Sequence, residues 1–183
     1  KIRMLNAGHQ ILANAGEILG LPTIAACMSD AQIAPFFRKV QIDEIAPHVS
    51  AVPSITPEAY LDLITRRFSN PEIHDTTRRV AFDGSSRHAG FILPILRDAL
   101  AAGASISGLA LTEALWARMC HGTREDGSMI EANDPIWTDL VAAAERARTE
   151  PIAWLQQTQI YGDLAQDEAF ATAFAGWLSF IWE

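Results

Sequence analysis

Hydrophobic side chains recur every three to four residues along most of the chain, a period typical of helices packed against a core. The first such stripe, over residues 2–19, consists of Met4, Leu5, Ile11, Leu12, Ile18 and Leu19. Gly20 and Pro22 end it, as a glycine cap followed by proline commonly does. Similar stretches predict helices over 23–28, 31–45, 56–68, 75–82, 85–102, 104–120, 134–149, a short one from 151, and 164–183. No stretch alternates like a β-strand, so the chain is predicted to be all-α.

Local signals refine several helix ends. Thr56 followed by Pro57 predicts a capped start, and Asp30 can cap the next helix upstream. Asp163 with Gln166 resembles a capping box for the last helix. Ser85 or Ser86 is expected to cap the 85–102 helix, which Pro94 should kink. Residues 121–133 form a polar loop in which a short hairpin can form.

Composition narrows the class of protein. The chain has 183 residues, 49% hydrophobic and 20% charged, which is typical of a globular domain with a real core. A formal charge of −8 argues against nucleic acid as a partner. The longest uncharged runs, 99–112 and 169–182, are shorter than the about 20 residues that cross a membrane. Cys27 and Cys120 are far apart in the sequence and form no C-x-x-C motif. We therefore expect two reduced thiols in a cytoplasmic protein.

The polar side of the first helix carries unusual chemistry. Lys1, Asn6 and His9 span about 140° on an ideal helix. Gln10 and Asn14 extend this arc, so amides and an imidazole gather where a plain solvated face would be rich in charged residues. On spacing alone, such residues are more often solvated or structurally bonded side chains than a functional site.

The order K-x-x-x-x-N-x-x-H resembles the lysine motif of the polyol-specific long-chain dehydrogenases, the mannitol dehydrogenase family. The surrounding residues 5–9, the segment 26–30 and the segment 79–87 are also similar to that family. The resemblance covers essentially all 183 residues, but only the family's C-terminal half. It implies a multi-helix domain similar to the C-terminal domain of 6-phosphogluconate dehydrogenase.

The resemblance also implies roles for three residues. Lys1 would be the general acid/base, Asn6 would donate its amide to the developing oxyanion, and His9 would orient the substrate oxygen. No G-x-G-x-x-G follows a strand here, so NAD or NADP would be held mainly by an N-terminal Rossmann domain. Residues 1–183 would then be the substrate-binding and catalytic C-terminal domain. The chain starts at Lys1 rather than methionine, and we expect a piece of a longer protein that is inactive alone.

Arg79 and Arg87 flank the turn signal at 83–85, so a sharp reversal could bring both guanidinium groups to one cavity. In the family, a basic pair at this spacing contacts substrate hydroxyls remote from the reacting carbon. In the family the second position is more often lysine. Arg87 presents a planar guanidinium with several donors, whereas a lysine presents a single ammonium charge. Bonding to Asp83 or to helix carbonyls is the alternative role for both arginines.

Three functions follow from these patterns. The first is zinc-independent oxidation of a mannitol-like polyol to its ketose, since neither paired cysteines nor a His-x-x-x-His suggests a metal site. The second is reduction of a keto-uronate such as fructuronate, with the arginines on its carboxylate. The third is a non-catalytic helical module for binding or dimerisation.

Overall fold

The computed structural model describes residues 2–183, with side chains from Arg3 onward, so Lys1 lies outside the described residues. This part of the chain is helical and holds only isolated β-bridges, which confirms the all-α prediction. The α-helices are α1 (Ile2–Ile18), α2 (Ile24–Ser29), α3 (Ile33–Val40), α4 (Pro57–Phe68), α5 (Thr77–Ala81), α6 (Gly84–Arg87), α7 (Leu93–Ala101), α8 (Ser107–Cys120), α9 (Trp137–Ala147), α10 (Thr158–Tyr161) and α11 (Glu168–Trp182). Short π and 3₁₀ turns lie at Gln41–Ile45, Ala46–His48, His88–Ile92, Pro151–Gln156 and Gly162–Gln166.

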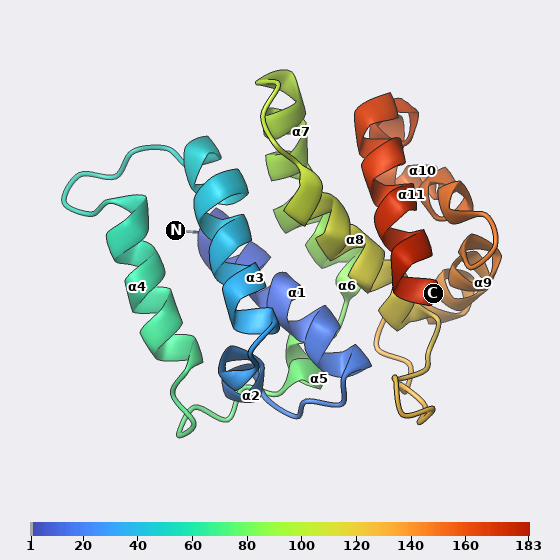
Figure 1. Ribbon diagram of the computed structural model, residues 1–183, viewed down its shortest axis with the longest axis horizontal. Helices are drawn as coiled ribbons and strands as arrows, with labels where there is room; N and C mark the ends of the chain where they lie inside the picture. The colour runs from blue at the N-terminus through green and yellow to red at the C-terminus, as the bar shows by residue number, and fades with distance from the viewer. Residues whose placement is uncertain (1) are drawn as a thin grey trace.

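Helix α1 lies at the centre of the molecule. It crosses the middle of Figure 1 behind α3, with α4 on one flank and α8 and α11 on the other. The predicted stripe of Met4, Ile11 and Ile18 is buried, as is Leu12, whereas Leu19 at the end of the stripe is exposed. The apolar face therefore packs as its period predicted.

The opposite side of α1 differs from the prediction. Gln10, Asn14 and Glu17 are as buried as the apolar stripe, with at most 4% of each residue exposed. Each of the three makes a hydrogen bond to a segment that wraps α1, although Gln10 Oε1 and Asn14 Oδ1 accept none from the described residues. The arc of amides past His9 is therefore internal, and α1 is buried on every side from residue 10 to residue 18.

Two predicted helices are interrupted by π turns. The 31–45 helix becomes α3 followed by the π turn Gln41–Ile45. The 85–102 helix becomes α6, the π turn His88–Ile92, and α7. Pro94 lies in the first turn of α7, where its missing N–H removes no helical bond. In place of the kink expected at Pro94, the chain forms a π turn, which is wider than an α-helical turn, directly before α7.

Helix caps show where local signals were sufficient. Thr56 accepts from the Ala59 amide, as predicted, and Asp30 Oδ1 accepts from Gln32 and Ile33. The prediction for Asp163 was wrong, because Asp167 caps α11 at the Phe170 amide. Asp163 instead pairs with Arg97 across the surface.

The serine caps of the 85–102 helix were also predicted wrongly. Asp83 precedes α6 in a left-handed conformation with φ of 60°, and the helix starts at Gly84. Ser85 and Ser86 bond to aspartates instead, Ser85 to Asp134 and Ser86 to Asp83.

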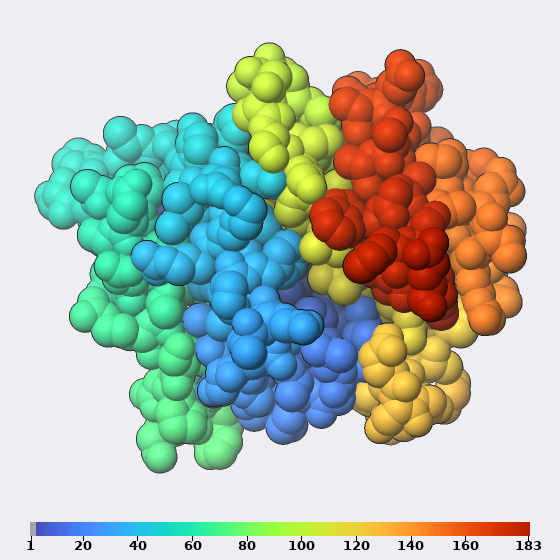
Figure 2. Space-filling view, viewed as in Figure 1, coloured from blue at the N-terminus to red at the C-terminus, as the bar shows by residue number. Residues whose placement is uncertain are grey.

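The C-terminal half packs α11 against α8, and Trp116 and Trp154 are fully buried there as packing residues. Between α3 and α11 the surface is hollowed (Figure 2), and this groove is lined mainly by apolar side chains of α1, α3, α8 and α11. Over residues 2–183, no helix combines the length and hydropathy that a bilayer crossing needs.

Gly16 should mark the closest approach between α1 and its neighbours. A Cβ there would lie 2.5 Å from Cys27 Sγ and 2.6 Å from Thr77 Cγ2, both in buried residues. Gly16→Ala should lower the free energy of unfolding in urea by about 1–3 kcal/mol. Gly176→Ala in α11, where no atom lies within 4 Å, should raise it by about 0.5–1 kcal/mol. Equal stability of the two variants would contradict this packing.

Candidate functional site

His9 is the most constrained of the described site residues. Its imidazole stacks on the ring of Phe68 at the end of α4, with ring centroids 4.5 Å apart and planes at 27°. The side chain is 18% exposed, so one edge of the ring reaches the surface. Asn6 lies one turn earlier on α1 and is half-buried. Residues three apart on a helix share a face, so the two side chains are neighbours there.

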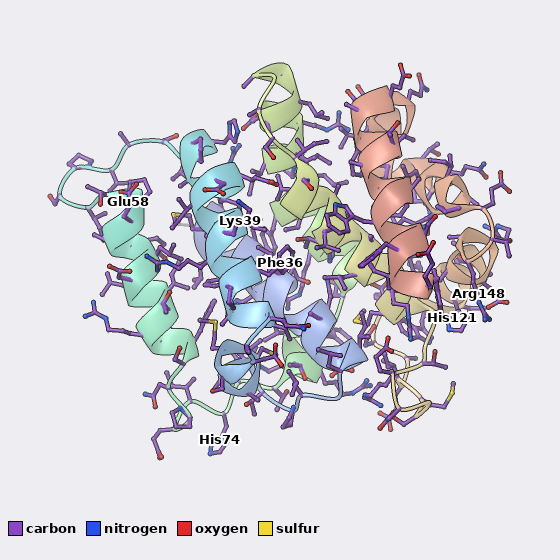
Figure 3. All side chains as sticks on the ribbon, viewed as in Figure 1. Phe36, Lys39, Glu58, His74, His121 and Arg148 are labelled. Atoms are coloured by element: carbon purple, nitrogen blue, oxygen red, sulfur yellow. The ribbon has the colours of Figure 1, made fainter. Side chains whose placement is uncertain are left out.

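Asp75 lies beside the imidazole, in the segment that leads into α5. Its Oδ2 is 3.7 Å from His9 Nε2, which is too long for a hydrogen bond. Its Oδ1 accepts from Arg79 Nε at 3.0 Å and from Arg79 Nη2. In Figure 3 the preceding residue, His74, marks this segment at the lower edge of the molecule, below α4.

Both predicted arginines contribute to the lowered pKa of His9. Burial lowers the pKa of His9 to about 4; the carboxylate of Asp75 opposes this shift, and the positive charges of Arg79, Arg87 and Arg67 add to it. His9 is therefore neutral at pH 7, with one ring nitrogen able to donate a hydrogen bond and the other able to accept one.

Hydrogen bonds from α1 hold the two arginine-bearing segments in place. Gln10 Nε2 donates to the carbonyl of Val80, the residue after Arg79. Asn14 Nδ2 lies 2.8 Å from Nε2 of His88, the residue after Arg87. The buried amides that were expected to extend the site face thus fix the backbone after Arg79 and the side chain after Arg87.

The turn between the arginines is fixed from its other side by the 131–134 loop. Asp83 donates its amide to the Asn133 carbonyl at 2.8 Å. The carboxylate of Asp134 accepts from the Ser85 amide at 2.7 Å and from its hydroxyl at 2.9 Å. The left-handed conformation of Asp83 is therefore held at both ends of the reversal.

The outcome for the predicted site residues is mixed. Asp75 lies between His9 and Arg79, Arg87 acts on His9 only through its charge, Asn6 lies one turn before His9 on α1, and Lys1 lies outside the described residues. Arg79 pairs with Asp75 rather than with Asp83 or a helix carbonyl. Within residues 2–183, no three His, Cys, Asp or Glu side chains are grouped as a metal site would require.

Sequence reasoning missed Asp75, Phe68 and the network around His88. The i,i+4 spacing of Asp75 and Arg79 was a readable signal for an ion pair. His88 is fully buried, with Nδ1 2.6 Å from Glu113 Oε1 and its ring stacked on Trp116. Nothing in the local sequence distinguishes this histidine from an exposed one.

Comparison with known proteins decides the family. The family model described as the mannitol dehydrogenase C-terminal domain matches residues 1–182. The chain belongs to this family.

Individual relatives agree with the family match. The mannitol 2-dehydrogenase of Cereibacter sphaeroides is 48% identical over 182 residues, which is all of this chain but 38% of that protein. The structure of Pseudomonas fluorescens mannitol 2-dehydrogenase, a ternary complex with NAD and D-mannitol, superimposes with a TM-score of 0.93 at 26% identity. It covers 99% of this chain and 37% of that one. A substrate-free D-sorbitol dehydrogenase gives a TM-score of 0.89 at 27% identity, covering 100% of this chain and 38% of that one.

For this member of the mannitol dehydrogenase family, the low pKa of His9 predicts a loss of stability in acid. Between pH 6.5 and 4 the unfolded chain takes up a proton at His9 that the folded protein does not, so stability falls as pH falls. The contribution is about 3 kcal/mol over the whole window. Urea unfolding at pH 7 and pH 4.5 should show a smaller acid loss for His9→Asn than for the wild type.

Exposed His74 serves as the matched control, and His74→Asn should keep the wild-type difference between the two pH values. An identical acid loss in wild type and His9→Asn would show that His9 is not held neutral by the fold.

Proposed function

We propose that this chain is the substrate-binding and catalytic C-terminal domain of a zinc-independent, NAD(P)-dependent polyol dehydrogenase. It would interconvert a mannitol-like sugar alcohol and its ketose. The observation that carries the proposal is a neutral His9 beside the Asp75–Arg79 pair, in a chain of the mannitol dehydrogenase family. The relatives named mannitol 2-dehydrogenase and the complex with D-mannitol support this substrate class.

Each residue then has a chemical task. Lys1 accepts the hydroxyl proton during oxidation and returns it during ketose reduction. Asn6 donates its amide to the oxygen as negative charge develops there. His9, neutral and fixed against Phe68, hydrogen-bonds the same oxygen and sets its position. Arg79 and Arg87 bind hydroxyl groups farther along the substrate.

The hydride acceptor is NAD or NADP, which supplies the oxidation when bound. We infer that an N-terminal Rossmann domain holds most of it, since the chain spans little more than a third of the length of its bacterial relative. The chain by itself should then be inactive. Two buried free thiols agree with a reducing, cytoplasmic location for the whole protein.

One observation favours a second candidate, the reduction of a keto-uronate. Three positive charges and one negative charge act on His9, which leaves the surroundings of the ring net positive. An anionic sugar acid would gain from such a field. The relatives and the D-mannitol complex favour the neutral polyol.

Lys1→Ala in the full-length protein should lower polyol turnover by about 10²–10⁴-fold, because the proton would lose its acceptor. Steady-state assays with mannitol and NAD or NADP would measure this change, and cofactor affinity should stay close to wild type. The chain has only one other lysine, Lys39, whose exposed ammonium pairs with Asp43 on α3 and its π turn. Lys39→Ala is therefore the matched control and should keep full turnover.

EDTA should leave the wild-type rate unchanged, since a lysine base replaces a metal. Near-wild-type turnover by Lys1→Ala, or zinc-restored activity after EDTA, would refute the lysine mechanism.

A further inference from the structure

Asp75 lies between two residues that the proposed function assigns to the substrate. One carboxylate oxygen is occupied by the Nε–Nη2 edge of Arg79. The other faces His9 Nε2 at 3.7 Å, and no hydrogen bond joins them. The Asp75 side chain is 16% exposed and the Arg79 side chain 66%, so the pair meets solvent mainly through the guanidinium.

This pairing changes what Arg79 offers to a ligand. The carboxylate cancels much of the guanidinium charge, while the Nη1 edge still donates hydrogen bonds. Oδ2 adds an acceptor beside His9 that the arginines cannot provide. A hydroxyl group both donates and accepts, so it can use the acceptor and the donors together.

A sugar acid meets the same pair differently. Its carboxylate only accepts hydrogen bonds, so it cannot donate to Oδ2. It is also repelled by Asp75, the one negative charge that acts on His9. Without Asp75, the three arginine charges would face the ligand uncompensated.

We propose that Asp75 is a specificity-determining residue that selects neutral polyols and ketoses against sugar acids. Its Oδ2 accepts a hydrogen bond from a substrate hydroxyl, and its charge neutralises Arg79 against a substrate carboxylate. This inference rests on the proposed function and deepens it, because it names the group that separates the two candidate substrate classes.

The backbone of Asp75 makes substitution practical. Its carbonyl accepts from the Ile24 amide at 2.9 Å, and its amide donates to the Ile73 carbonyl at 2.8 Å. Thr76 caps α5 through its own hydroxyl. None of these bonds uses the Asp75 side chain, so asparagine should keep the segment in place.

The test compares Asp75→Asn with wild type in the full-length protein, measuring kcat/KM for reduction of fructose and of fructuronate. The fructose-to-fructuronate ratio should fall by at least about 10- to 100-fold, the range expected for losing a hydrogen bond to a charged group. Asp163→Asn is the matched control, because Asp163 also pairs with an arginine but lies on the surface beside α7. Its ratio should equal that of the wild type.

The outcomes separate this inference from the proposed function. A wild type that reduces neither fructose nor any other ketose would refute the proposed function, whatever Asp75 does. An active wild type whose ratio is unchanged in Asp75→Asn would overturn the role of Asp75 alone. An equal loss on both substrates would mean a structural role and would also overturn it. If Asp75→Asn unfolds, Asp75→Glu, which keeps the charge, and Asp75→Ser, which removes it, are compared by the same ratio.

Discussion

The complete burial of the second half of α1 is the constraint on which the site depends. Polar residues on the buried side of a helix cost free energy unless neighbouring segments form hydrogen bonds with them. Gln10 bonds to Val80, Asn14 to His88, and Glu17 to the Thr77 hydroxyl at 3.1 Å. These partners alternate in sequence with Arg79 and Arg87, the arginines proposed to bind substrate. The bonds that stabilise the buried polar face therefore also hold the residues that follow Arg79 and Arg87 against α1.

The network continues from His88 into the C-terminal half. His88 contacts Glu113 on α8, whose second oxygen accepts from the Tyr161 hydroxyl at 2.8 Å. Trp154 in turn donates to that hydroxyl at 2.6 Å. All four side chains are fully buried. Removing any one of them would leave a buried polar group of its neighbour without a hydrogen bond, which destabilises the fold. Elements far from the site thus hold the π turn that follows Arg87.

The sequence allowed prediction of most helices, because their apolar stripes keep the 3.6-residue period. It predicted Thr56 as a cap correctly and Asp163 wrongly, since two aspartates near the start of α11 compete and only tertiary contact with Arg97 separates them. The π turns could not be predicted from the sequence, because no local residue pattern specifies them. The likeness to the 6-phosphogluconate dehydrogenase domain stays a prediction.

The site shows the same division between local and tertiary information. The motif residue His9 and the pair Arg79 and Arg87 were singled out through the family resemblance, and their shared role in binding substrate stays a prediction. The burial of Gln10 and Asn14 could not be predicted from the sequence, because a polar helix face has the same residue pattern whether water or another segment covers it. Asp75 escaped notice because its importance lies in two partners, one of them 66 positions away in the chain.

The central claim is that the polyol is held between α1 and the α5–α6 turn. A crystal structure of the full-length protein with mannitol and an oxidised nicotinamide cofactor tests it most directly. The account predicts the reacting oxygen within hydrogen-bond distance of His9 and Asn6, and a remote hydroxyl between Asp75 and Arg79. Mannitol bound without contact to α1, or with Asp75 and Arg79 both turned away from it, would contradict the account.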